Sequence, residues 1–192
     1  MRGAIRYIGN GVNTDDFPIE DSCDKDCGSV LVEGWNALNP TKDTAQIGPR
    51  VAQRLKRQGY QILAYSQRPP KEFKDVPDEF HVKPSLETLN GLYRRATILI
   101  KASHCDARSC SPMEAATKGT VTARAIECGD DDLQHGYNCL RCEYDEKKLH
   151  MICLELLEDE PLRTALAANA KHHVKEYSWD YWMPQIERIL TT

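Results

Sequence analysis

The sequence lacks an excess of basic charge, a long apolar run, an internal repeat and any low-complexity tract. Lysine and arginine number 25 against 29 aspartate and glutamate, which gives a net charge of −4 and no overall basic field to attract a nucleic-acid backbone. No apolar stretch approaches the ~18 residues of a membrane-spanning helix, and the first residues show no signal-peptide core. We therefore expect a cytoplasmic protein with no nucleic-acid partner and no membrane span.

The chain does contain enough apolar residues for one domain with a substantial core. It has 192 residues, of which 41% are hydrophobic and 28% charged, with 11 glycines and 10 prolines. This composition is typical of globular proteins rather than disordered ones, and the length suits one domain better than two.

Eight cysteines leave two interpretations open. The close pairs are Cys23 with Cys27 and Cys139 with Cys142, and more than a hundred residues separate them. Structural zinc usually takes its ligands from two short knuckles, and disulfides are rare in reducing compartments. We expect reduced thiols. A zinc site formed by the two pairs is the alternative, and stoichiometric zinc in protein purified without chelators would reveal it.

Strand and helix patterns alternate along the chain from about residue 29. Short apolar runs predict strands near 29–34, 60–65, 96–100 and 120–123. Helical spacing of apolar residues, with caps and glycine or proline at the ends, predicts helices at 43–58, after Ser85, from Ser111 to Gly119, from about 146, and from Pro161. Alternation of this kind predicts a doubly wound, Rossmann-like parallel sheet with helices on both faces.

The loop from Lys101 to Glu114 is the candidate site, because open parallel sheets bind ligands beyond the carboxyl ends of their strands. It leaves an apolar strand, is rich in polar residues and ends at a predicted helix start. Free backbone N–H groups there would suit a phosphate. The alternative is structural: Ser111 and Glu114 fit a capping box with Pro112 at the first helical position, which would leave Glu114 without a ligand.

Several motifs in order resemble the donor-nucleotide domain of retaining glycosyltransferases of the GT-B fold, family 4. The motifs are Asn10-Gly11-Val12-Asn13-x3-Phe17 near the start, Leu89-x2-Leu92-Tyr93-x2-Ala96-x3-Ile100-x2-Ser103, Asp106-x7-Glu114-Ala115-Ala116-x2-Gly119, and Glu176-Tyr177-Ser178-Trp179 near the end. The likeness spans most of the chain. It implies the C-terminal half of a GT-B fold, which binds a nucleotide-diphosphate sugar without a metal or another cofactor.

The resemblance also assigns roles to individual residues. It implies that Glu114 holds the ribose hydroxyls and that Asp106 lies beside the donor sugar. Main-chain N–H groups around Ser109, Cys110 and Ser111 would hold the diphosphate. Lys42 matches a lysine that the family uses as a phosphate-binding cation.

Three positions depart from the family's pattern. Trp35 stands after Gly34 where the family has an arginine, so one cation of the diphosphate site is missing. Arg108 lies where the family prefers an aromatic residue and could replace that charge. Asp106 is one methylene shorter than the usual glutamate, which bears on donor choice and activity.

The resemblance implies a two-domain enzyme whose acceptor domain is missing from this chain. Residues 1–28 would form a hinge-like segment and 177–192 a helix that crosses to the first domain, with exposed aromatic side chains able to self-associate. The resemblance implies that transfer of a hexose to a glycan or glycolipid retains the anomeric configuration, and that the enzyme acts in polysaccharide biosynthesis. A non-catalytic module that binds sugar nucleotides or another partner is the alternative.

Other conspicuous residues have ordinary structural interpretations. We expect His104 to be a loop side chain rather than a base, and 130–132 to be a solvated acidic turn rather than a metal site. The aromatic residues Trp179, Tyr181 and Trp182 are expected to pack a terminal helix rather than stack on sugars. Main-chain atoms near 81–83 are candidates for holding the base.

Overall fold

The computed structural model of the chain describes residues 11–21, 25–26, 28–33, 43, 46–68, 72, 74–107, 109–129 and 132–191. The described strands are β1 (Ser29–Glu33), β2 (Gln61–Ser66), β3 (Glu79–Val82), β4 (Ile98–Asp106), β5 (Val121–Gly129) and β6 (Cys139–Cys142). The described helices are α1 (Ile47–Arg57), α2 (Leu86–Arg95), α3 (Cys110–Ala116), α4 (Glu146–Glu158), α5 (Glu160–Glu176) and α6 (Trp179–Leu190).

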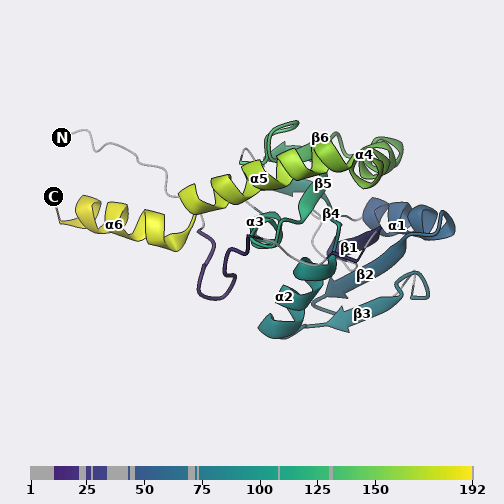
Figure 1. Cartoon of the computed structure of the whole chain (residues 1–192), viewed down its shortest axis with the longest axis horizontal. Helices are drawn as coiled ribbons and strands as arrows, with labels where there is room; N and C mark the ends of the chain where they lie inside the picture. The colour runs from purple at the N-terminus through teal and green to yellow at the C-terminus, as the bar shows by residue number, and fades with distance from the viewer. Residues whose placement is uncertain are drawn as a thin grey trace.

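The six strands form one parallel sheet in the order β3-β2-β1-β4-β5-β6 (Figure 1). The order reverses direction between β1 and β4, which are neighbours paired from Val30 with Ile98 to Val32 with Ile100. Crevices at such a reversal are the usual ligand sites of doubly wound sheets. The predicted Rossmann-like fold class is confirmed.

Helices cover both faces of the sheet and form two apolar layers with it. On one face, α1 and α4 bury Val51, Leu55 and Leu156 against alternate strand residues. On the other, α2, α3 and α5 bury Leu92 and Val174. Because successive strand residues point to opposite faces, central strands buried on both sides read as continuous apolar runs.

The described elements differ from the predicted ones in two short strands, two helix starts and the lengths of β4 and β5. Strands β4 and β5 have nine residues each and end at Asp106 and Gly129, beyond the predicted ends near 100 and 123. The first six residues of the predicted loop from Lys101, His104 among them, therefore belong to a strand. Strands β3 and β6 were not predicted; they have four residues each and lie at the two edges of the sheet.

Helix α1 begins at Ile47, four residues later than predicted, because Gln46 has a left-handed backbone (φ 53°). The Asp43 carboxylate accepts hydrogen bonds from the N–H groups of Ile47 and Gly48, both at 2.8 Å.

The predicted capping box at α3 is wrong. The helix begins at Cys110, so Pro112 is its third residue rather than its first. The Ser111 hydroxyl hydrogen-bonds the Glu33 carboxylate instead of the helix's own backbone. A contact with a residue 78 positions away has therefore replaced the local one.

The expectation of reduced thiols is wrong for one pair of cysteines. Cys105 and Cys128 form a disulfide with a Cα–Cα distance of 4.9 Å. They face each other in register at the ends of β4 and β5, so the sheet itself brings together residues that are 23 positions apart. The described free cysteines are Cys110, Cys139, Cys142 and Cys153, whereas Cys23 and Cys27 lie outside the described residues.

The segment from Gly11 lies against the start of α6, the last helix. Val12 and Ser178 form a parallel bridge, in which the Val12 N–H donates to Tyr177 O and the Trp179 N–H donates to Val12 O, both at 3.0 Å. Helix α6 continues away from the sheet beyond α5 (Figure 1) and has no buried residue. Its side chains Trp179 and Tyr181 are exposed.

None of the helices in the described ranges combines the length and the apolar character that crossing a membrane would require.

Candidate functional site

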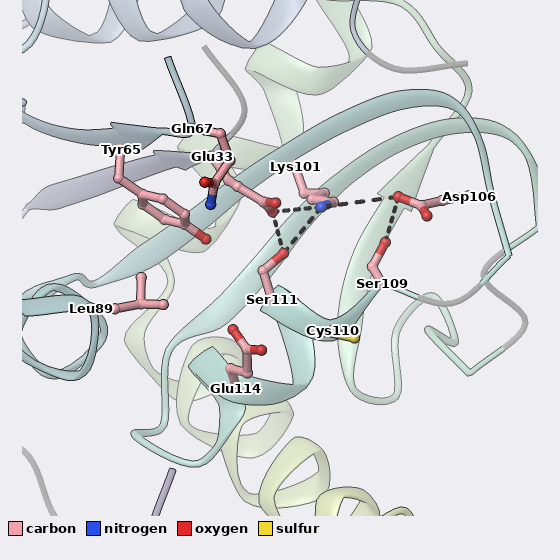
Figure 2. A pocket seen from close by; sticks show the side chains of 10 residues that line it. All are labelled: Glu33, Tyr65, Gln67, Leu89, Lys101, Asp106, Ser109, Cys110, Ser111 and Glu114. Atoms are coloured by element: carbon pink, nitrogen blue, oxygen red, sulfur yellow. Dashed lines mark hydrogen bonds and ion pairs between the residues drawn. The ribbon is translucent and has the colours of Figure 1, made fainter. Parts of the chain in front are cut away.

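A cavity of about 310 Å³ lies at the carboxyl ends of β1, β2 and β4. Its described lining residues are Glu33, Tyr65, Gln67, Leu89, Lys101, Asp106, Ser109, Cys110, Ser111 and Glu114 (Figure 2). The cavity therefore lies between β1 and β4 and beside the start of α3, where the predicted loop from Lys101 to Glu114 ends. Its volume is near the lower end of the range for small-molecule sites.

An ion pair between a buried lysine and a partly buried glutamate crosses one wall of this cavity. The Lys101 ammonium, in the middle of β4, donates to the Glu33 carboxylate at 2.6 Å and to the Ser111 hydroxyl at 3.1 Å. Ser111 in turn donates to the same Glu33 oxygen. Burial opposes ionisation of Glu33, but Lys101 and Ser111 outweigh it and lower the pKa of the carboxyl. Glu33 is therefore charged at neutral pH and serves as the counter-ion of Lys101.

Asp106 belongs to the same network. Its Oδ2 atom lies 3.5 Å from Arg124 Nη2 and 4.0 Å from Lys101 Nζ, and it accepts a hydrogen bond from Ser109 Oγ at 2.9 Å. Arg124 is fully buried in β5, where it lies in register with Lys101. The Asp106 side chain is 11% exposed, so a second, partly buried carboxylate is paired within the cavity wall.

Glu114 lies on α3, and its carboxylate projects into the cavity (Figure 2). The Tyr93 hydroxyl donates to Glu114 Oε2 at 3.0 Å, and the hydroxyls of Tyr93 and Tyr65 lie 2.8 Å apart. Burial raises the pKa of Glu114, and the nearby Glu33 charge adds to this, while the hydrogen bond from Tyr93 opposes it. A half-buried carboxylate held in one orientation can accept hydrogen bonds from a diol.

Glu114→Gln is expected to be more stable than the wild type at pH 7. Because the folded-state pKa of Glu114 is raised, the group favours folding at acid pH and this contribution disappears as the pH rises through that pKa. The neutral amide avoids the cost of a half-buried charge and can still accept from Tyr93. Urea unfolding at pH 7 should show the gain, and at pH 4 the difference should shrink. A less stable variant at pH 7 would contradict this expectation.

The predicted site residues fall into two groups. Asp106, Ser109, Cys110, Ser111 and Glu114 all line the one cavity. Gly34, Trp35, Lys42 and Arg108 lie outside the described residues, as do Asp130 and Asp131 of the acidic turn.

Two histidines of interest make local contacts. His104 stacks on Tyr144, with ring centroids 3.9 Å apart, and its Nδ1 atom lies 3.1 Å from Glu127; it is not among the described lining residues of the cavity. His81, in the stretch considered for base binding, hydrogen-bonds Glu79 at 2.7 Å.

Glu33 and Arg124 were not among the predicted site residues, and Lys101 was predicted only as the start of the candidate loop. A signal was present, because Lys101 and Arg124 interrupt apolar runs in strands that are buried on both faces, where a charge needs a partner. Among the described residues, no group of three or more His, Cys, Asp or Glu side chains is arranged to hold a metal ion.

Solved structures of glycosyltransferases share the fold. TarM from S. aureus, in a complex that contains UDP, matches with a TM-score of 0.75 and 15% identity over 96% of this chain. HepE from Anabaena, in complex with UDP-glucose, matches with a TM-score of 0.73 and 14% identity over 96% of this chain. The C-terminal domain of the group 1 glycosyl transferase LpcC from Francisella tularensis matches with a TM-score of 0.66 and 16% identity over 88% of this chain. No protein-family model and no curated protein matches the sequence.

The matches cover different shares of these proteins. The chain spans 39% of TarM and 56% of HepE, but all of the LpcC C-terminal domain. It therefore has the fold of the C-terminal domain of GT-B glycosyltransferases, as the sequence motifs implied.

Proposed function

We propose that this chain binds a nucleotide-diphosphate sugar and serves as the donor domain of a retaining glycosyltransferase that transfers a hexose to a glycan or glycolipid. The observation that carries the proposal is the position of Glu114, which projects into a cavity at the strand-order reversal of a GT-B C-terminal fold. HepE, which shares this fold, was solved with UDP-glucose. The acceptor would bind a separate domain.

The proposed reaction breaks the bond between the anomeric carbon and the diphosphate oxygen. The acceptor hydroxyl forms the new bond on the same face of the sugar, and its proton passes to the departing diphosphate. Such a step needs fixed dipoles and cations around the leaving group. We assign this task to the N–H groups of Ser109 to Ser111, with Lys42 and Arg108 as the expected cations and no metal. Asp106 would lie beside the sugar.

Loss of the Glu114 carboxylate should weaken nucleotide binding at least tenfold, since charged hydrogen bonds to the ribose hydroxyls would be lost. Isothermal titration of UDP, GDP and ADP into the wild type and Glu114→Ala measures this effect. Glu143→Ala removes an exposed carboxylate, 79% accessible, outside the lining of the cavity, and should bind as the wild type does. Equal affinity in Glu114→Ala and wild type would contradict the assignment.

A second candidate function is a non-catalytic module that binds sugar nucleotides. The position of Asp106 favours it, because the carboxylate expected beside the donor sugar lies 3.5 Å from Arg124 and accepts a hydrogen bond from Ser109 at 2.9 Å. A transfer assay with the full product of the coding region and its donor separates the two. Nucleotide binding with transfer supports the enzyme, whereas binding without transfer supports the module.

A further inference from the structure

The charge of the described part of the cavity wall does not suit a diphosphate as it stands. Among the described side chains that line it, Glu33, Asp106 and Glu114 carry carboxyl groups, and Lys101 is the one cation. Lys101 is not available to an incoming anion, because its ammonium donates to Glu33 at 2.6 Å and to Ser111 at 3.1 Å. The cation, the hydroxyl and the carboxylate form a closed triangle (Figure 2).

This triangle has the chemistry of an occupied anion site. A buried ammonium and a hydroxyl converge on one carboxylate oxygen, Oε2 of Glu33. Phosphate oxygens accept hydrogen bonds from the same donors with similar geometry. The carboxylate thus occupies the position that a phosphate oxygen would take beside Ser111, a residue at which the proposed function places the diphosphate.

Lys101 and Glu33 differ in how easily each side chain can move out of the ion pair. The Lys101 side chain is 10% exposed and projects from the middle of β4, so it cannot reach solvent without vacating the cavity wall. Glu33 is the last residue of β1, and its side chain is 22% exposed. A carboxylate at the edge of the cavity can rotate into water, whereas an unpaired buried ammonium would be costly. Exchange of one anion for another keeps Lys101 paired throughout.

We propose that Glu33 is a resident anion of this site, which the donor's diphosphate must displace from Lys101 and Ser111, and that Glu33 thereby sets the affinity for diphosphates. This inference rests on the proposed function and adds two residues to it. Lys101 is a further cation that contacts the diphosphate, and Glu33 is the specificity-determining residue that competes with the diphosphate for Lys101. A nucleoside without phosphates does not need the exchange, so its affinity is independent of Glu33.

The test titrates inorganic pyrophosphate, UDP and uridine into the wild type, Glu33→Gln and the double variant Glu33→Gln/Lys101→Met. Glu33→Gln should bind pyrophosphate and UDP at least tenfold more tightly than the wild type, about 1.4 kcal/mol, and uridine equally well. In the double variant an uncharged pair replaces the ion pair of Glu33 and Lys101. It should therefore bind pyrophosphate and UDP no more tightly than the wild type does. If circular dichroism shows that Glu33→Gln does not fold, Glu33→Ala, which leaves space for water beside Lys101, takes its place in the titrations.

A matched control is Glu20→Gln. Glu20 pairs at 2.7 Å with Lys118, whose side chain is fully buried, and it is not among the described lining residues of the cavity. Glu20 also pairs with Arg94 at 2.5 Å. The variant Glu20→Gln therefore removes the same charge from an ion pair that includes a buried lysine, and it should leave pyrophosphate binding unchanged. If Glu20→Gln gained as much affinity for pyrophosphate as Glu33→Gln, the overall charge of the protein would explain the effect and the inference would be overturned. A gain that persists in the double variant, or no gain in Glu33→Gln, would overturn it as well.

The outcomes also separate the inference from the proposed function. If Glu33→Gln gains pyrophosphate binding but neither it nor the wild type binds UDP, GDP or ADP, the anion exchange stands and the nucleotide assignment fails. If UDP binding depends on Glu114 but is no tighter in Glu33→Gln, the assignment stands and the resident-anion inference is overturned.

Discussion

Arg124→Met is expected to lower the free energy of unfolding by about 3 kcal/mol or more, the usual cost of removing one partner from a buried ion pair. Arg124 is fully buried, and its Nη2 atom lies 3.5 Å from Asp106, whose side chain is 11% exposed. Methionine fills similar space but leaves Asp106 with the more distant Lys101, 4.0 Å away, and removes hydrogen bonds to Lys101 O and Ser103 Oγ. Urea unfolding at pH 7 measures the loss.

Two further variants show whether the missing charge is the cause. Adding Asp106→Asn to Arg124→Met removes the carboxylate that has lost Arg124 as its partner. The double variant should therefore recover part of the lost unfolding free energy. Arg50→Met is the control, because Arg50 is 55% exposed and lies 3.9 Å from Glu146; it should change stability by about 0.5 kcal/mol or less. If Arg124→Met and Arg50→Met cost the same, the buried network contributes nothing specific.

Replacing both Cys105 and Cys128 with serine is expected to cost about 3 kcal/mol of unfolding free energy. The disulfide closes a loop across a sequence separation of 23 residues, and constraining a loop of that length in the unfolded chain accounts for stabilisation of this size. Unfolding of the wild type with a dithiol reductant should match that of the double variant without it. Because Cys105 precedes Asp106 directly, the loss should also loosen the β4 edge of the cavity.

The control for the disulfide is Cys110→Ser, which removes an exposed free thiol and should leave stability within about 0.5 kcal/mol of the wild type. Peptide mapping of unreduced protein should recover the Cys105 and Cys128 peptides joined. Separate peptides, or unfolding that the reductant does not change, would contradict the pairing.

The architecture followed from the sequence because central strands that are buried on both faces appear as apolar runs between helical patterns. Val30 to Val32 and Ile98 to Ile100 are fully buried, and both runs were predicted as strands. The edge strands β3 and β6 were missed because each has only four residues and includes partly exposed polar ones. Edge strands need less apolar surface, so local pattern alone separates them poorly from loops.

Only part of the site could be found by reading along the chain. Asp106 and Glu114 belong to one spaced motif, and both line the cavity. The pair of Glu33 and Lys101 is 68 residues apart, and nothing local to either residue indicates its partner. Tertiary contacts also decided the start of α3, where the Ser111 hydroxyl turned to Glu33. Pairings between distant charges appear only when the sheet sets strands side by side.

The bridge between Val12 and Ser178 means that the two ends of this domain cannot vary independently. A Cβ atom added at Gly11 would lie 2.9 Å from Trp179, nearer than side chains tolerate, and Thr14 donates to Asp180 at 2.7 Å across the same junction. A bulkier residue in the segment of Gly11 to Thr14 would therefore require a smaller residue at the start of α6, and the reverse. Related sequences should therefore record paired changes at this crossing, and hybrids that combine ends from different relatives should fold best when both ends come from one parent.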